Sequence, residues 1–150
     1  MHTDNLLFLY TKDLNRLKAE LEQYKSEKNI WAVDKGIANS AGNLCLHLLG
    51  NLNHFIGAEL GHTGYTRQRD LEFSQKNVPS AVLLQQVDET IDMLNKTLRQ
   101  LSQSDYEKEY PQTVLPAKVS VEAFLFYLTT HLAYHLGQVN YHRRLLDAGA

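Results

Sequence analysis

The chain has 150 residues, of which 43% are hydrophobic and 21% are charged, and its formal net charge is −2. These values are typical of one globular domain with one core, predicted to span residues 1–150. Without a basic face it is not expected to bind nucleic acid, and without 18 consecutive apolar residues it is not expected to cross a membrane. The N-terminus lacks the features of a signal peptide, and the single cysteine, Cys45, excludes an intramolecular disulfide. We therefore expect a cytoplasmic protein.

The first half of the chain predicts two helices. The first covers about residues 4–27, because apolar side chains recur every three or four positions. These side chains are Leu6, Leu7, Tyr10, Leu14, Leu17, Leu21 and Tyr24. The second helix covers about residues 41–60, with Asn39 or Ser40 as its N-cap. It is apolar nearly all round, which predicts a central position, and its three glycines (Gly42, Gly50 and Gly57) suggest close approach of another helix.

The second half predicts two more helices and two long connections. The third helix begins near Ser80, directly after Pro79, and the last runs from about Ser120 to Leu146. Connections over residues 61–80 and 103–118 separate them, and connections this long are often functional. Four helices and two long connections predict an all-α fold, a four-helix bundle in which a helix can cross over. The pattern leaves open which helices run parallel.

The most informative pattern is a polar stripe on the last helix. His131, His135, Gln138 and His142 lie at i, i+4, i+7 and i+11, and such a stripe is costly to bury without a partner such as a metal. The Cβ atoms of His131 and His135 would be about 5–6 Å apart, close enough for both imidazoles to bind one ion. His47, in the apolar second helix, is the third candidate ligand.

Three imidazoles with an open coordination position suit a hydrolytic or Lewis-acid metal site. His142 lies about 10 Å along the helix from His135, and His54 about 10.5 Å from His47, so neither is expected to join the same ion. The alternative is that the two histidines fall four apart by chance and are ordinary core groups.

The same residues resemble the DinB superfamily. Asn39-Ser40-x-x-Asn43-Leu-x-Leu-His47-Leu-x-Gly50-Asn51 is similar to its second helix, and His131-x-x-x-His135-x-Gly137-Gln138 is similar to its last helix. Arg67-x-Arg69-Asp70-x-Glu72-Phe73 resembles a stretch of one subfamily whose function is not established. The resemblance spans almost the whole chain. It implies a four-helix bundle that binds a divalent metal, commonly nickel or zinc, on His47, His131 and His135.

The resemblance implies two chemistries that the motif does not separate. Some DinB-like proteins are metal-dependent hydrolases, and others transfer or isomerise with a low-molecular-weight thiol as cosubstrate. We therefore expect a small-molecule substrate and a metal-dependent hydrolase or thiol-dependent transferase. A non-catalytic protein that binds a metal or ligand in a stress response is the alternative, and a purely structural bundle is a third interpretation.

Other polar residues are weaker candidates for roles near the metal. Gln138 and Tyr127 lie one turn from the paired histidines and would orient a ligand or water, or only stabilise the bundle. Glu59 and Glu72 would act as a base if the long connection folds over the site, or else lie on the surface as ordinary carboxylates. Arg67 and Arg69 would bind a substrate carboxylate, or pair with Asp70 and Glu72.

Three further expectations complete the sequence-based interpretation. His54 would face the substrate or the solvent, or would support a metal ligand. Cys45 is rotated by about 200° from His47 and is predicted to be a small buried residue rather than a fourth ligand. The apolar stripe of the first helix is generous for a four-helix core, which favours a homodimer.

Overall fold

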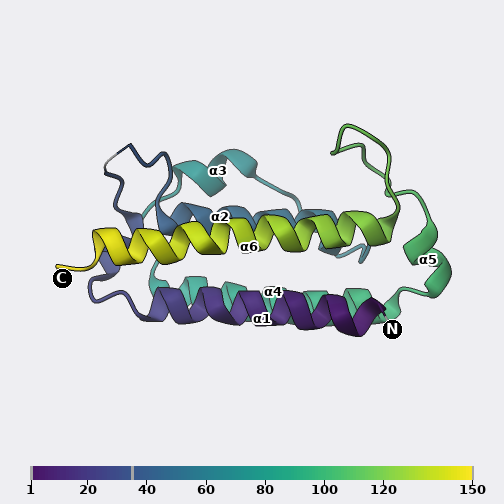
Figure 1. Ribbon diagram of the computed structural model, residues 1–150, viewed down its shortest axis with the longest axis horizontal. Coiled ribbons are helices and arrows are strands. Elements are labelled where there is room, and N and C mark those ends of the chain that lie inside the picture. Colours follow the sequence, from purple (N-terminus) through teal and green to yellow (C-terminus); the bar gives the residue numbers. More distant parts are fainter. Residues whose placement is uncertain (1, 35, 150) are drawn as a thin grey trace.

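The computed structural model describes residues 2–34 and 36–149, and helices dominate this part of the chain. In chain order they are α1 (His2–Glu22), the 3₁₀-helix η1 (Glu27–Trp31), α2 (Ala41–Leu52), the π-helix η2 (Asn53–Ala58), α3 (Arg69–Ser74), α4 (Ser80–Gln100), α5 (Gln103–Glu107) and α6 (Val121–Leu146). The four long helices α1, α2, α4 and α6 lie along one axis and form the bundle (Figure 1). The predicted all-α four-helix bundle is confirmed.

The bundle combines parallel and antiparallel neighbours. α1 packs against α4 and α6, and α2 packs against the same two helices from the other side. Lys18 pairs with Asp88, and Arg99 pairs with Asp4, so α1 and α4 are antiparallel. Figure 1 shows that α1 and α6 run one way, and α2 and α4 the other. Because α2 and α4 are parallel, residues 59–79 must return along the whole length of α2, and they carry α3 over its outer face.

The core is built from the apolar stripes that the sequence predicts. The predicted stripe of α1 is buried and consists of Leu6, Leu7, Tyr10, Leu14, Leu17 and Leu21, whereas Tyr24, beyond the end of the helix, is only partly buried. α2 begins at its predicted cap, where the Ser40 side chain accepts a hydrogen bond from the Asn43 amide. Ser120 caps α6 in the same way through the Ala123 amide. Among the described residues, no helix is long and apolar enough to cross a membrane.

Two predicted helix boundaries are wrong, for identifiable reasons. α1 ends at Glu22 rather than near residue 27 because the amides of Lys25 and Ser26 donate to the Asp147 carboxylate, a partner from the far end of the chain. The second helix is regular only to Leu52 and then continues as η2. In that turn Glu59 N–H bonds to the carbonyl of His54, five residues earlier, which widens the helix locally.

Both long connections contain short helices that the apolar periodicity did not reveal. The first holds α3, and the second holds α5 with its capping box at Ser102. The second connection closes through a short backbone pairing between Tyr110 and Val119, whose N–H···O distance is 2.9 Å. α3 matters most for the site because it packs directly against α2.

Candidate metal centre

Three histidines from two helices meet where α2 faces α6. His47 lies in the middle of α2 and is buried, and His131 and His135 project from consecutive turns of α6. The Nε2 atoms of His47 and His131 are 3.3 Å apart, and one nitrogen from each of the three rings lies within 4.8 Å of the others. A ligand nitrogen lies about 2 Å from a bound zinc ion. The cluster is therefore compact enough for all three rings to contact one ion.

Hydrogen bonds to two of the rings select the tautomer that a metal requires. Glu72 Oε1 lies 3.0 Å from His47 Nδ1, and Gln138 Oε1 lies 2.7 Å from His135 Nδ1. Both oxygens are acceptors, so each Nδ1 carries the proton and donates it. The Nε2 lone pair of each ring is then left for a metal, which is how protein metal sites commonly orient their histidines.

The third ring differs because its Nδ1 atom is buried without a hydrogen bond. His131 Nδ1 is buried and has no hydrogen-bond partner among the described residues. Burial, followed by the charges of His135, His47 and Arg67, lowers the pKa of His131 to about 4. Burial also lowers the pKa of His135, and His47 lowers it further, although the bond to Gln138 opposes them. Both rings are therefore neutral at neutral pH, as metal ligands must be.

The donor set fits a divalent transition metal. Three neutral imidazoles suit zinc, nickel or similar ions, and they leave coordination positions open for other ligands. The close approach of the Nε2 atoms of His47 and His131 is what a site prepared for a cation would present. The structure thus brings together the three histidines that the sequence predicted as ligands.

A buried ion pair supports His47 from behind. Arg67 donates from Nε to Glu72 Oε2 at 2.8 Å and from Nη2 to Glu72 Oε1 at 2.9 Å. Burial alone would raise the pKa of Glu72, but the hydrogen bonds from Arg67 and His47 outweigh it and lower that pKa. Glu72 is only 6% exposed, so it lies neither at the mouth of the site nor on the surface, the two positions expected from the sequence. The alternative in which Arg67 pairs with Glu72 is the one observed.

Glu72 reaches His47 because residue 50 is a glycine. A Cβ atom at Gly50 would overlap the Glu72 carboxylate. α3 itself is anchored by Asn43, whose amide Nδ2 donates at 2.9 Å to the carbonyls of both Glu72 and Gln75. The sequence predicted that another helix approaches α2 at its glycines. At Gly50 the group that approaches is the Glu72 side chain of the short helix α3. At Gly42 the neighbour is the Trp31 ring.

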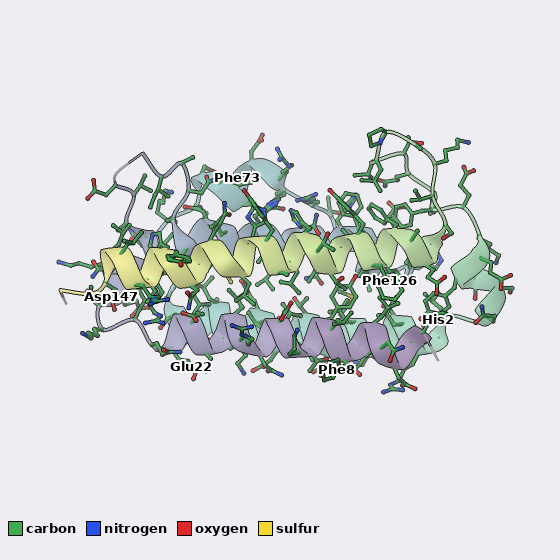
Figure 2. All side chains as sticks on the ribbon, in the orientation of Figure 1. His2, Phe8, Glu22, Phe73, Phe126 and Asp147 are labelled. Carbon is green, nitrogen blue, oxygen red and sulfur yellow. The ribbon has the colours of Figure 1, made fainter. Side chains whose placement is uncertain are left out.

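Aromatic and cationic side chains of the 67–73 stretch complete the cover. The Phe73 ring lies against the His47 ring with a centroid distance of 4.9 Å, and Figure 2 shows Phe73 on α3. The Arg69 guanidinium lies over the Phe73 ring at 5.2 Å, and that of Arg67 lies over the Phe55 ring at 5.6 Å. The long connection therefore folds over the candidate centre, as the sequence-based interpretation required.

The remaining candidates have other contacts. Glu59 accepts a hydrogen bond from Gln112, His54 packs against Phe55, and Tyr127 stacks on Phe124. His142 lies apart from the cluster, as its spacing predicted. Its ring bonds to Tyr24 Oη at 2.6 Å and to the Ala32 carbonyl at 2.8 Å. Cys45 is fully buried, as predicted for a structural residue.

Sequence reasoning did not identify Asn43, or the link from Glu72 to His47. These residues lie 29 and 25 positions away from their partners, so no helical periodicity connects them. The usable signal was the combination of an acidic and a basic residue in a long connection with a glycine in the facing helix. That combination is too common in sequences to identify the contact between Glu72 and His47 without the structure.

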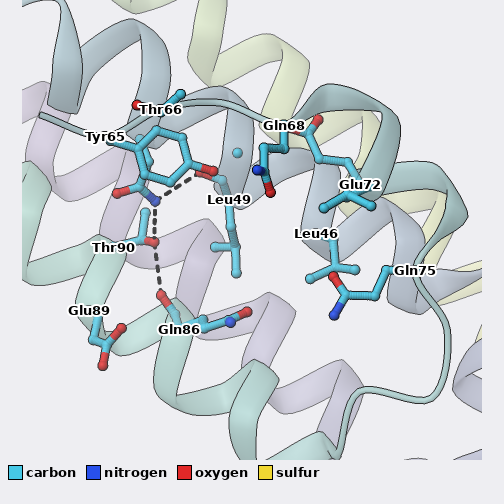
Figure 3. Close-up of a pocket in the computed structure, with 13 residues that line it drawn as sticks. Leu46, Leu49, Tyr65, Thr66, Gln68, Glu72, Gln75, Gln86, Glu89 and Thr90 are labelled. Carbon is cyan, nitrogen blue, oxygen red and sulfur yellow. Dashed lines mark hydrogen bonds between the residues drawn. The ribbon is translucent and has the colours of Figure 1, made fainter.

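A separate cavity of about 380 Å³ lies between α2, residues 65–75 and α4. Figure 3 shows its polar lining, with Gln68 and Gln75 on one side and Gln86 and Thr90 on the other. Glu72 borders this cavity, but none of the three clustered histidines does. Its hydroxyl and amide groups partly satisfy one another, since Asn53 donates to Thr90 at 2.9 Å.

Comparison with known proteins gives a family and a related fold. The family model described as "Protein of unknown function (DUF1572)" matches residues 5–149, and no curated protein matches. One similar solved structure is that of YfiT from Bacillus subtilis, described as "a probable metal-dependent hydrolase with an unusual four-helix bundle topology". The two share 15% sequence identity and a TM-score of 0.74, over 95% of this chain and 86% of the other. The likeness shows that the chain has the fold of the YfiT four-helix bundle. The family match covers nearly the whole sequence, and the chain therefore belongs to the DUF1572 family.

Proposed function

We propose that the protein is a metal-dependent hydrolase of a small molecule, with one divalent cation, nickel or zinc, held by His47, His131 and His135. The observation that carries this proposal is the convergence of three imidazoles, each with one nitrogen within 4.8 Å of the others, two of which also have their Nδ1 atoms bonded to the Glu72 and Gln138 side-chain oxygens. The description of YfiT as a probable metal-dependent hydrolase supports it from outside the chain.

Each part of the centre has a separate task. A bound divalent cation would supply Lewis acidity and would lower the pKa of a water or thiol that it binds. The three histidines hold that cation and leave it a full positive charge. Glu72 and Gln138 fix the orientation of two ligand rings, and Arg67 keeps the Glu72 carboxylate ionised. Phe73 shields His47 from solvent on the α3 side.

Transfer of a low-molecular-weight thiol is the second chemistry that this centre could support. An open position beside three neutral ligands accepts a thiolate as readily as a hydroxide, and the donor set alone does not choose between them. Assays of ester and amide hydrolysis, run beside assays of thiol addition to an electrophile, distinguish the two. Metal binding without turnover of any such substrate would favour a stress-response protein that binds its metal or ligand without catalysis.

Elemental analysis of the untagged protein tests the metal site. Wild type is expected to hold about one divalent ion per chain after incubation with nickel or zinc, and His131→Ala far less, because each ligand contributes to a site of only three. His62→Asn is the matched control, since His62 is exposed and asparagine tolerates its positive φ of 50°. Equal metal content in wild type and His131→Ala would reject the proposed site.

A further inference from the structure

We propose that a second cavity, between residues 36–39 and α6, is the substrate pocket of this centre, and that it takes an uncharged apolar group, aromatic or alkyl. This inference rests on the proposed function. The cavity has a volume of about 510 Å³, within the range of about 300–1,000 Å³ that small-molecule sites occupy.

The cavity touches the histidine cluster at His135, whereas His47 and His131 do not belong to its lining. His135 and Gln138 belong to its lining, and so does Leu44, one turn before His47 on α2. It continues along the α2–α6 seam towards Tyr141 and Leu145. A molecule that contacts a metal on His135 can therefore extend its remaining part into this space without crossing a helix.

The opposite direction along the same seam is filled by aromatic rings. Phe55 packs edge-on against Phe124 at a centroid distance of 5.4 Å, and Tyr110 packs against Phe124 at 4.1 Å. The Arg67 guanidinium closes over Phe55, and Phe73 covers His47 from α3. The cavity at residues 36–39 is thus the side from which the geometry favours entry of a substrate.

The lining determines the chemical class of the ligand. None of the described residues in the lining is an acid, a lysine or an arginine. Most of its side chains are apolar or aromatic, and the larger ones are Ile37, Leu44, Tyr134, Tyr141 and Leu145. Tyr134, Tyr141 and Leu145 are 65%, 63% and 54% exposed, so a ligand would cover apolar surface that now faces water. A charged group placed here would lose hydration without gaining an oppositely charged partner among the described lining residues.

Several of the polar groups that line the cavity are already engaged. Both ring nitrogens of His142 are occupied by Tyr24 and the Ala32 carbonyl. Gln138 uses its oxygen on His135, so its amide nitrogen, like the Asn39 amide and the Tyr134 and Tyr141 hydroxyls of the lining, is a donor that can meet a ligand carbonyl. Arg144 stacks on the Tyr141 ring at 5.6 Å and does not belong to the lining. The cavity of Figure 3, by contrast, is rich in amides and touches none of the clustered histidines.

Hydroxamic acids with different tails test the pocket on the metal-loaded protein, because the hydroxamate group chelates the metal and the tail explores its surroundings. Calorimetry would compare acetohydroxamate, 4-phenylbutanohydroxamate and a tail of similar length that ends in a carboxylate. We expect the phenyl tail to tighten binding about tenfold or more over acetohydroxamate, because its apolar surface is buried. The carboxylate tail should give no gain.

Variants in the pocket locate the effect. Tyr141→Ala and Leu145→Ala should remove most of the gain from the phenyl tail, measured in each variant as the ratio of the Kd of acetohydroxamate to that of 4-phenylbutanohydroxamate. Both side chains are largely exposed, so these variants are expected to fold. Phe8→Ala on α1 is the matched control, since Phe8 is 65% exposed and lies outside the cavity.

The outcomes separate this inference from the proposed function. If the protein holds one metal per chain and binds acetohydroxamate, but the phenyl tail gives no gain, the pocket assignment is overturned and the metal site stands. A gain that persists in Tyr141→Ala and Leu145→Ala overturns it as well. If wild type holds no metal in elemental analysis, the proposed function fails, and the pocket assignment fails with it.

Discussion

At the scale of single residues, Glu72 links segments that are far apart in the sequence. Its carboxylate contacts Arg67 in the long connection, His47 on α2 and the surface of Gly50. Buried carboxylates are stable when paired and hydrogen-bonded, and Glu72 meets both conditions. Its position behind His47 Nδ1 makes it a positioning residue for the candidate centre, because it fixes the ring and increases the basicity of Nε2.

Changes at Glu72 and Gly50 should weaken metal binding without removing a ligand. Glu72→Gln removes the charge, and Gly50→Ala places a methyl group where the carboxylate lies. We expect each to lower metal affinity by about 10–100-fold, the usual effect of losing such an outer partner. Competition with a chromophoric chelator measures the affinity.

Gly137→Ala is a stringent control for both variants. It lies on α6 between His135 and Gln138, yet a Cβ there meets nothing within 4 Å. Metal affinity should be unchanged, and the helix should gain stability by up to about 1 kcal/mol. Wild-type affinity in both Glu72→Gln and Gly50→Ala would show that the carboxylate does not position His47.

At the scale of helices, α3 depends on its docking to α2 because it is too short to be stable alone. It spans only Arg69–Ser74, and isolated helices of this length do not persist in water. Asn43 supplies the contact by donating to two carbonyls at the end of α3, groups that have no partner within the helix. Asn43 is itself positioned by the cap of α2, where Ser40 Oγ donates to Asn43 Oδ1 at 2.7 Å.

Asn43→Ala should release α3 from the bundle. The buried Glu72 carbonyl and the partly buried Gln75 carbonyl would lose their donor, at a cost of about 1–3 kcal/mol for the buried one, and the segment that carries Glu72 would open more often. We expect faster amide hydrogen exchange over residues 67–76 and weaker metal binding. Ser120→Ala, which removes the equivalent cap of α6, should cost about 1 kcal/mol and leave exchange in 67–76 near the wild-type level. Unchanged exchange in Asn43→Ala would contradict this account.

At the scale of the whole molecule, the C-terminal end of α6 is tied to the first loop. Asp147 accepts hydrogen bonds from the amides of Lys25 and Ser26 and from Asn29. One turn earlier, His142 is 3% exposed and bonds to Tyr24 and to the Ala32 carbonyl. Arg143 and Glu20 form an ion pair beside them. These contacts fix the parallel register of α1 and α6. Homodimer formation stays a prediction.

The burial of His142 predicts how stability changes with pH. Burial lowers the pKa of His142 below its ordinary value of 6.5, although the bond to Ala32 opposes this shift. The unfolded chain therefore takes up a proton at a higher pH than the folded one. The stabilisation that the buried, neutral His142 contributes is complete above about pH 6.5. It is lost as the pH falls towards the pKa of His142 in the folded protein. The lowered pKa values of His131 and His135 act in the same direction in the metal-free protein.

Urea unfolding of the metal-free protein between pH 8 and pH 5 tests this expectation. Wild type should lose stability below about pH 6.5, and His142→Gln should lose less over the same interval because one of the three contributing rings is absent. At pH 8 the variant should be about 1–3 kcal/mol less stable, since the Tyr24 hydroxyl loses its buried partner. His62→Asn, at an exposed position, should keep the wild-type dependence on pH. If the free energy of unfolding of His142→Gln depended on pH as strongly as that of wild type, the contribution assigned to His142 would be contradicted.

The sequence by itself determined the four long helices, their buried faces, the start of α2 at an Asn39 or Ser40 cap and the three histidines. All of these follow from local periodicity and from short-range hydrogen bonds, and the pairing of His131 with His135 is set by one turn of helix. Only the tertiary structure decided that α2 and α4 run parallel and that Glu72 supports His47 across Gly50. It also decided that α1 ends before the segment whose amides donate to Asp147. These features join residues separated by tens of positions, and no local pattern encodes a contact that exists only after the chain has packed.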